Sequence, residues 1–229
     1  MQRSNSLSAL RLSASLALFA LVCALPATPA AKPHVITYGK QMAVKLFLGP
    51  DESHNIPIRV RGLFVDGKLR EFITGDVHEV TDRLFVVRRA FRLNNSLPED
   101  EKKLTSWVWQ RGGWLLVDRL TGHVSQVPLT DFDPFYSDAS WFRDYAAYCG
   151  LNDAGDKLSA VVMQLGRRKP LMKKELGPAS LGDTPDSACS APTWERKPTR
   201  VTFQPANGTR QTYTVLGHAW DAAPGSDDE

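Results

Sequence analysis

The feature that most constrains the fold is a series of short β-rich runs separated by turn residues. The clearest pairs of runs surround Asp66-Gly67 and Asn207-Gly208, and they are residues 58–65 with 68–73, and residues 200–204 with 211–216. Glycine adopts the positive φ of tight hairpin turns at no steric cost, so an Asp-Gly or Asn-Gly pair between such runs indicates a hairpin. The sequence therefore predicts a chain built from antiparallel hairpins.

Further runs extend this pattern along the chain. We expect strands at residues 35–38, 42–48, 77–80, 83–93, 158–165 and 167–174, the last as a basic edge strand. Another hairpin is predicted from residues 105–110 and 114–120, around Arg111, Gly112 and Gly113. Residues 177–198 are rich in Gly, Pro and Ser and are expected to form a loop.

One helix is predicted, over residues 137–149. Ser137 or Asp138 can cap its start, and Gly150 follows its end. The aromatic residues Trp141, Tyr145 and Tyr148 fall at positions i, i+4 and i+7, which places them on one face of a helix.

Together these elements indicate a mainly β fold: a single β-sandwich or open-barrel-like domain of antiparallel hairpins with one short helix. An alternative is a small propeller-like array, because the pattern T-G-x-V-x-x-V occurs in residues 69–80 and again in residues 116–127. We find no third copy, and such arrays need at least three repeats. We therefore favour chance similarity between two turns.

The N-terminus has the pattern of a signal peptide. Arg3 and Arg11 precede an apolar run over residues 12–25, which is too short to span a bilayer core of roughly 30 Å. Small residues follow Pro26, and cleavage after Ala30 is preferred to an uncleaved anchor or to a lipoprotein processed at Cys23. The expected organisation is a signal peptide (1–30), a mainly β domain (31–221) and a disordered acidic tail (222–229). The expected location is the periplasm or the extracellular space.

Export changes the cysteine count. Cys23 would leave with the signal peptide, so only Cys149 and Cys189 would remain. Two thiols in an oxidising compartment most simply form a disulfide, which the chain-entropy model credits with about 4 kcal/mol for a loop of this length. The alternative is two buried free thiols.

Charge argues against a nucleic-acid partner. The net charge is +3, and losing Arg3 and Arg11 would leave about +1, which is far from the clustered basic footprint of nucleic-acid binders. No other apolar run reaches membrane length, so no transmembrane segment is expected after signal removal. The densest basic cluster consists of Arg167, Arg168, Lys169, Lys173 and Lys174. It would suit an anionic or envelope partner, or it is a solvated edge strand that resists pairing.

Familiar catalytic motifs are absent from the sequence. It contains no G-x-S-x-G, P-loop, G-x-G-x-x-G, H-E-x-x-H or C-x-x-C pattern. Asp76 and His78 are candidate metal ligands, because side chains two apart on a strand point the same way; a solvated strand face is the favoured interpretation. Oxygen-bearing side chains also gather at Asp131, Asp133 and Ser137-Asp138, for which turn and cap chemistry is favoured over calcium. No cofactor is expected.

The tryptophans offer a possible stacking surface for sugars, but most are expected in the core. Trp107, Trp109, Trp114 and Trp141 have apolar surroundings, whereas Trp194 and Trp220 lie near predicted loops and are expected to be exposed.

The sequence alone does not identify a ligand or substrate. The leading hypothesis is an exported, non-catalytic binding or envelope-associated module, which an exposed aromatic or basic groove would support. The alternative is a secreted hydrolase whose active site is assembled from distant residues. A deep pocket that holds His78 or His123 beside two carboxylates would favour the hydrolase. A scaffold protein without any pocket is a third hypothesis.

Overall fold

The computed structural model describes residues 32–47, 55–94, 107–182 and 187–220. The proposed signal peptide, Cys23 and the acidic tail lie outside the described residues. The strands in chain order are β1 (Ile36–Tyr38), β2 (Met42–Phe47), β3 (Asn55–Val65), β4 (Lys68–Glu79), β5 (Leu84–Asn94), β6 (Trp107–Asp118), β7 (Val124–Gln126), β8 (Ser140–Phe142), β9 (Tyr145–Leu151), β10 (Lys157–Gln164), β11 (Met172–Pro178), β12 (Cys189–Glu195), β13 (Arg200–Pro205) and β14 (Gln211–Thr214).

The mainly β fold is confirmed. Strands are the only regular elements in the described ranges, and those ranges hold no helix long and apolar enough to cross a membrane.

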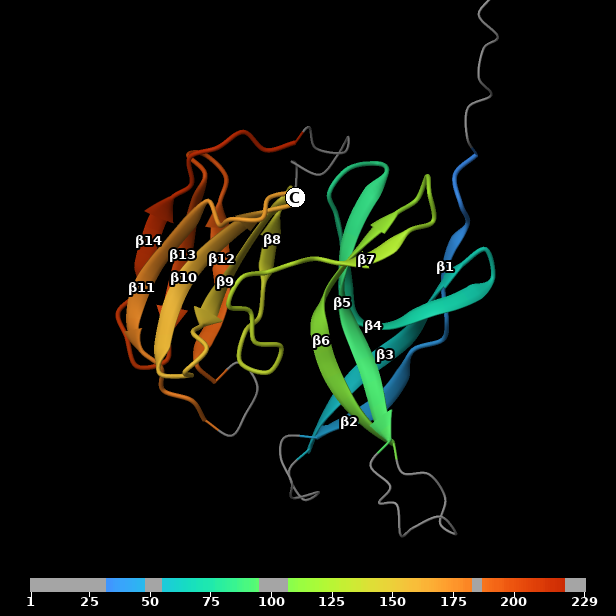
Figure 1. Cartoon of the computed structure of the whole chain (residues 1–229), viewed down its shortest axis with the longest axis horizontal. Helices are drawn as coiled ribbons and strands as arrows, with labels where there is room; N and C mark the ends of the chain where they lie inside the picture. Colours follow the sequence, from blue (N-terminus) through green and yellow to red (C-terminus); the bar gives the residue numbers. More distant parts are fainter. Residues whose placement is uncertain (1–31, 48–54, 95–106, 183–186, 221–229) are drawn as a thin grey trace, which may run out of the picture. The chain divides into compact units, whose positions relative to one another are not determined.

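Strands β2 to β6 form a closed ring (Figure 1). Antiparallel pairing joins β2 to β3, β3 to β4, β4 to β5 and β5 to β6. A parallel bridge between Leu46 and Trp109 then connects β2 to β6 and closes the circuit. Strand β1 adds to β3, and β7 adds to β6.

The ring has its own apolar core, because side chains along each strand point alternately to its two faces. Its fully buried members are Leu63, Ile73, Phe85, Val87, Leu115 and Val117. On β5, Phe85 and Val87 belong to this core, while the intervening Val86 belongs to a second core outside the ring. Successive side chains of a strand point to opposite faces, so one strand serves two cores.

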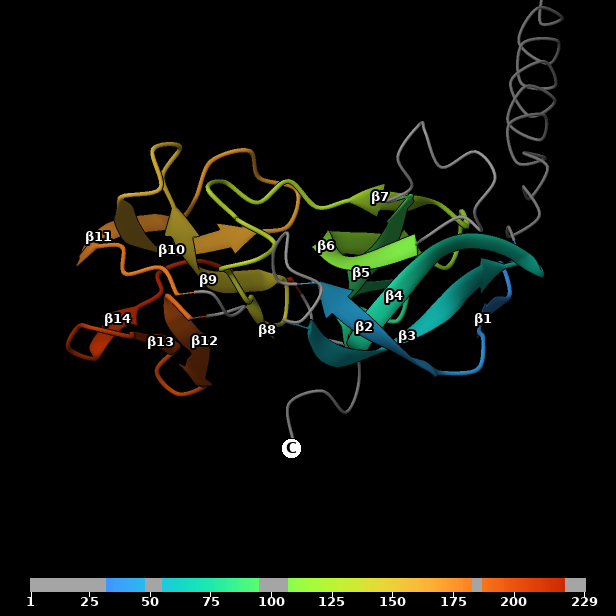
Figure 2. The same ribbon diagram turned by 90° about the horizontal axis from the view of Figure 1, so that it is seen from below.

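Strands β8 to β14 form two sheets that face each other across a third core (Figure 2). One sheet has the order β11-β10-β9-β8 and the other the order β12-β13-β14. The core between them includes Tyr145, Cys149, Val162, Val201 and Phe203. The predicted disulfide is present and joins Cys149 on β9 to Cys189 on β12, with their Cα atoms 6.2 Å apart.

Both faces of the β9–β10 pair are covered. Ala146, Tyr148, Val161 and Met163 pack in one core with Val80, Val86 and Trp114 from the first part of the chain. The opposite faces of β9 and β10 pack against β13. This double burial explains why these two strands are apolar almost throughout.

The predicted helix over 137–149 is wrong. The segment forms the hairpin β8–β9, in which Phe142 pairs with Tyr145 around a turn at Arg143 and Asp144. Arg143 takes a positive φ of 52° in this turn. Tyr145 and Tyr148 contribute to different cores on opposite faces of β9, so burial on two sides selects the period of a strand over that of a helix.

Two further expectations are corrected. Residues 111–113 make no turn, because β6 runs unbroken through them; a Cβ added to Gly112 would lie 3.1 Å from Cβ of Arg89, so glycine permits close approach to β5. Strand β12 falls inside the expected loop 177–198. It lies at a sheet edge, and its register shifts between Ser190 and Thr193, which accommodates Pro192.

Several turns match the prediction. The hairpin at Asp66 and Gly67 is confirmed, with φ of 51° and 74°, and β13 and β14 form the expected C-terminal hairpin. The repeated T-G-x-V pattern has two structures: Gly75 lies within β4 at an irregularity in its pairing with β5, whereas Gly122 lies in the turn between β6 and β7. The two copies are therefore no structural repeat.

Candidate functional site

An open cavity of about 490 Å³ combines aromatic, basic and acidic side chains. Strands β3 to β6 form one side, and residues 138–141 form the other. We call it the tryptophan cavity, and the lining residues that matter for its chemistry are Asp76, His78, Arg111, Trp114, Asp138 and Trp141.

An irregularity in β4 places Asp76 and His78 in this cavity. The register with β5 shifts between Thr74 and His78, and Gly75 there has a φ of 72°. Such bulges turn side chains away from the regular alternation. The structure therefore brings the two predicted site residues to one cavity, with Asp76 exposed and His78 half-buried.

His78 is held in a defined orientation. Its Nε2 lies 2.8 Å from the carbonyl oxygen of Arg143, and its ring stacks on Trp141 with centroids 6.0 Å apart. A carbonyl oxygen only accepts, so Nε2 carries the proton and the neutral ring keeps a lone pair on Nδ1. Burial lowers the pKa of His78, which favours this neutral form.

Trp114 and Trp141 carry buried N–H groups without acceptors. Their rings meet edge to face with centroids 5.4 Å apart, and neither Nε1 has a hydrogen-bond partner in the described part of the chain. Trp114 is only 8% exposed. A buried donor left unsatisfied costs about 1–3 kcal/mol. Both rings line the cavity, while their N–H groups are buried within the protein.

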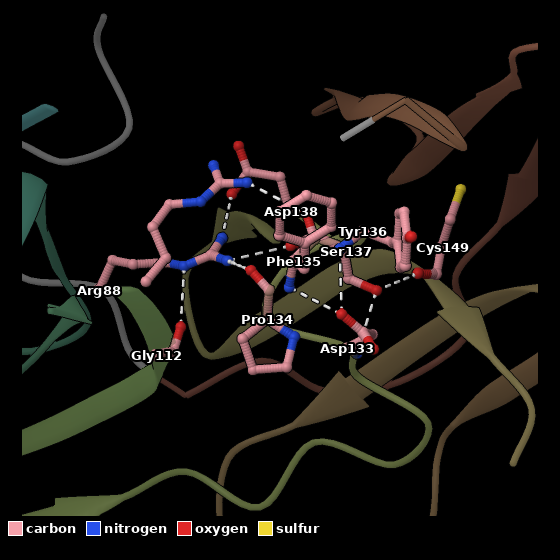
Figure 3. A network of polar contacts seen from close by, with 10 residues as sticks. Arg88, Gly112, Asp133, Pro134, Phe135, Tyr136, Ser137, Asp138 and Cys149 are labelled. Atoms are coloured by element: carbon pink, nitrogen blue, oxygen red, sulfur yellow. Dashed lines mark hydrogen bonds and ion pairs between the residues drawn. The ribbon is translucent and has the colours of Figure 1, made fainter. Parts of the chain in front are cut away.

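Arg88, on β5, links the two sides of the cavity (Figure 3). The residue is 4% exposed, and its guanidinium donates to the carbonyl oxygens of Gly112, Pro134 and Ser137 at 2.8–3.1 Å and to Asp138 at 2.7 Å. These bonds tie residues 134–138, which precede β8, to strands β5 and β6. In the sequence, the only signal for this role is a charged residue within an apolar strand, which does not reveal its partners.

The carboxylates of Asp131 and Asp133 make contacts within the protein. Asp133 accepts hydrogen bonds from the backbone N–H groups of Phe135 and Tyr136 at 2.7 and 3.1 Å, and Asp131 pairs with Lys173 at 2.5 Å. Together with the bond from Asp138 to Arg88, these contacts use the carboxylates internally. Among the residues that the structure describes, no three His, Cys, Asp or Glu side chains gather as a metal site. Asp76 and His78 are thus a pair without a third such partner.

The basic cluster is divided by the structure. Arg167, Arg168 and Lys169 are exposed in the turn between β10 and β11. Lys173 is paired with Asp131, and Lys174 is exposed on β11, which is the edge strand of its sheet. The predicted edge strand is present, but it begins five residues later than expected, at Met172.

The tryptophan expectations were partly wrong. Trp107 was expected in the core and is 46% exposed, whereas Trp194 was expected at the surface and is half-buried, stacked on Tyr145 with centroids 6.4 Å apart. Trp114 is buried and Trp220 is 37% exposed, as predicted.

Comparison with protein-family models, with curated proteins and with solved structures found no match for this chain. Functional inference therefore depends on the geometry of the site.

Proposed function

We propose that the protein is an exported, non-catalytic binding module that holds a saccharide unit in the tryptophan cavity. The observation that carries the proposal is an open cavity lined by the rings of Trp114 and Trp141 together with a few polar side chains.

The other lining groups suit the same ligand class. Saccharide hydroxyls both donate and accept, and the cavity offers a carboxylate acceptor in Asp76 and a cationic side chain in Arg111. The indole rings supply an apolar surface for the C–H face of a sugar ring. A cavity with aromatic walls and a few placed polar groups is the usual form of a small-molecule site.

Export supports this ligand class, because envelope polysaccharides lie outside the cytoplasmic membrane. The proposal of export rests on the signal-peptide pattern of residues 1–30, and a disulfide between Cys149 and Cys189 suits an oxidising compartment. The mass of the protein recovered from the periplasm or the medium tests the proposed cleavage after Ala30.

Thermal unfolding with a panel of mono- and oligosaccharides tests the binding function. A ligand at about 100 times its dissociation constant stabilises the folded state by about 2.7 kcal/mol, which for a chain of this size raises Tm by roughly 5–10 °C. Trp141→Ala should abolish the shift. Trp107→Ala, which removes an exposed tryptophan outside the cavity, should preserve it. If no saccharide shifts Tm, the proposed function is wrong.

A secreted hydrolase is the second candidate, favoured by one specific observation. His78 lines the cavity together with two carboxylates, Asp76 and Asp138. The lone pair on Nδ1 of His78 would let it activate a water molecule, but Asp138 is already bonded to Arg88 and no serine or cysteine lines the cavity. Release of reducing ends from a bound oligosaccharide, lost in His78→Gln and Asp76→Asn, would establish the hydrolase over the binding module.

A further inference from the structure

The face of β4, β5 and β6 that lines the tryptophan cavity continues beyond it along the same three strands (Figure 1). Side chains two apart on a strand share a face, so the pairings between these strands arrange their side chains in rows. The register shift in the β5–β6 pairing keeps Arg111 and Trp114 on one face, although they are three residues apart, and both line the cavity. The rows, from the cavity outwards, are Thr74 with Arg88 and Trp114, Phe72 with Ala90 and Arg111, Arg92 with Trp109, and then Asn94 with Trp107.

Aromatic rings pack against one another along the outer rows. Phe72 and Trp109 meet edge to face with centroids 5.2 Å apart, and Ala90, the partner of Phe72 on β5, is completely buried. The guanidinium of Arg92 lies over the rings of Phe72 and Trp107, at 5.9 and 4.6 Å from their centroids. A cation held over two rings joins them through attraction to both π faces. The four side chains therefore form one continuous layer.

We call this layer the aromatic strip; its members are Phe72, Arg92, Trp107 and Trp109. Trp107 is 46% exposed, Arg92 is exposed, and the other two are half-buried. In the described part of the chain, no hydrogen bond or ion pair engages the Arg92 guanidinium, so its N–H groups are available while stacking holds it in place. Contiguous exposed apolar surface of this kind marks interaction sites.

We propose that the tryptophan cavity and the aromatic strip together bind one linear saccharide chain; this inference rests on the proposed function. From Trp114 to Trp107 the face extends for about 20 Å, at about 3.3 Å per residue, which is several times the width of one sugar ring. Indole and phenyl rings offer apolar surface to the C–H faces of sugars, and the N–H groups of Arg92 offer donors to their oxygens. The cavity holds one unit, and the following units lie along the strip.

A single-stranded nucleic acid also stacks on aromatic rings, but it suits this face less well. Proteins that bind such strands combine the rings with a positively charged groove that follows the phosphates. The aromatic strip contributes one cation, Arg92, and the cavity at its end contains the exposed carboxylate of Asp76. Uncharged hydroxyls can bond both groups, whereas phosphates would be repelled by Asp76.

Calorimetric titration with linear saccharides of increasing length tests the inference. The probes are the mono- to hexasaccharides of glucose, of N-acetylglucosamine and of galacturonic acid. In at least one series the affinity should rise about tenfold or more from the monosaccharide to the hexasaccharide, because the longer chain reaches the aromatic strip.

Trp107→Ala should remove most of this gain with length. It should leave the monosaccharide affinity unchanged, because a single unit occupies the cavity alone. Arg92→Gln should act in the same direction with a smaller loss. The matched variants Trp220→Ala and Arg168→Gln remove an exposed tryptophan and an exposed arginine that lie outside the strip and the cavity, and they should keep the wild-type dependence on length.

The outcomes separate this inference from the proposed function. If monosaccharides bind but hexasaccharides bind no more tightly, or if Trp107→Ala keeps the full gain, the inference is wrong and the proposed function stands. If no member of any series binds, both are wrong. An oligothymidylate that binds more tightly than every saccharide, and is released by salt, would assign the strip to a nucleic acid instead. Circular dichroism checks that each variant is folded.

Discussion

Two sets of buried polar groups differ in whether the protein satisfies their hydrogen bonds. Arg88 is almost completely buried and bonds one carboxylate and three carbonyl oxygens. Trp114, Trp141 and Tyr145 each bury a donor for which the described residues provide no acceptor. Buried polar groups that serve the fold are normally satisfied within the protein. The two regions should therefore respond differently when a buried polar group is removed, with a large loss of stability at Arg88 and little or none at an unsatisfied donor.

The largest effect is expected from Arg88→Met. This change leaves the Asp138 carboxylate and several buried carbonyl oxygens without their donor, so the free energy of unfolding should fall by about 3–5 kcal/mol. The adjacent Arg89 is 37% exposed and pairs with Glu71 at 3.0 Å, so Arg89→Met should cost less than about 1 kcal/mol. Urea unfolding of both variants measures the contrast, and equal losses would contradict the structural role given to Arg88.

The next effect concerns the sheets β8–β14, where a covalent bond contributes to stability. Replacing Cys149 and Cys189 by alanine opens a loop with a sequence separation of 40 residues and should lower the free energy of unfolding by about 2–4 kcal/mol. Urea unfolding of this variant, and of the wild type with and without a reductant, measures the loss. An unchanged unfolding midpoint after complete reduction would show that packing alone holds the two sheets together.

Two tyrosines on β9 provide the sharpest comparison. Tyr148 donates its hydroxyl to the carbonyl oxygen of Thr130 at 2.6 Å, whereas the equally buried hydroxyl of Tyr145 donates to none of the described residues. Tyr148→Phe should therefore lower the free energy of unfolding by about 1 kcal/mol, while Tyr145→Phe should leave it unchanged or raise it slightly. Chemical denaturation of the two variants decides the point. A matching loss in both would show that the Tyr145 hydroxyl has a partner in solution.

The smallest effect is a pH dependence from His78. Its pKa in the folded protein lies below the ordinary value of 6.5, chiefly because of burial. As the pH falls through 6.5, the unfolded chain therefore takes up a proton before the folded protein does, and stability decreases. His78→Gln should flatten the stability profile between about pH 7 and pH 5, which urea unfolding at successive pH values measures. A slope that persists in the variant would assign it to another group.

Asp118 acts at lower pH than His78. Hydrogen bonds from Arg83 lower the pKa of its carboxyl. Its stabilising contribution is therefore present above pH 3.8 and is lost as the pH falls below that value.

Local signals in the sequence predicted the parts of the fold that depend on local chemistry. The hairpin at Asp66 and Gly67 requires positive φ at both positions, and the sequence supplies residues that tolerate it. The disulfide followed from a count of cysteines. The predicted helix over 137–149 is wrong because the spacing of Trp141, Tyr145 and Tyr148 fits the period of a helix but does not exclude a strand. Burial on both faces of β9 is a tertiary property that this spacing does not record.

The site was predictable only where two of its residues lie on one strand. Asp76 and His78 are two apart on β4, and the structure brings both to the same cavity. Trp114 and Trp141 reach it from β6 and β8, which pair with different neighbours in different sheets. Their meeting depends on packing between sheets and on the bonds of Arg88, whose partners lie 24 to 50 residues away and are not indicated by any local pattern.

Arg143 supports the tryptophan cavity through its backbone. Its carbonyl oxygen accepts the hydrogen bond from His78, and the residue takes a positive φ of 52° in the turn between β8 and β9. The orientation of the His78 ring therefore depends on the backbone conformation of a turn 65 residues away in the sequence. The tight turn that replaced the expected helix thus determines how one ring of the cavity wall is presented to a ligand.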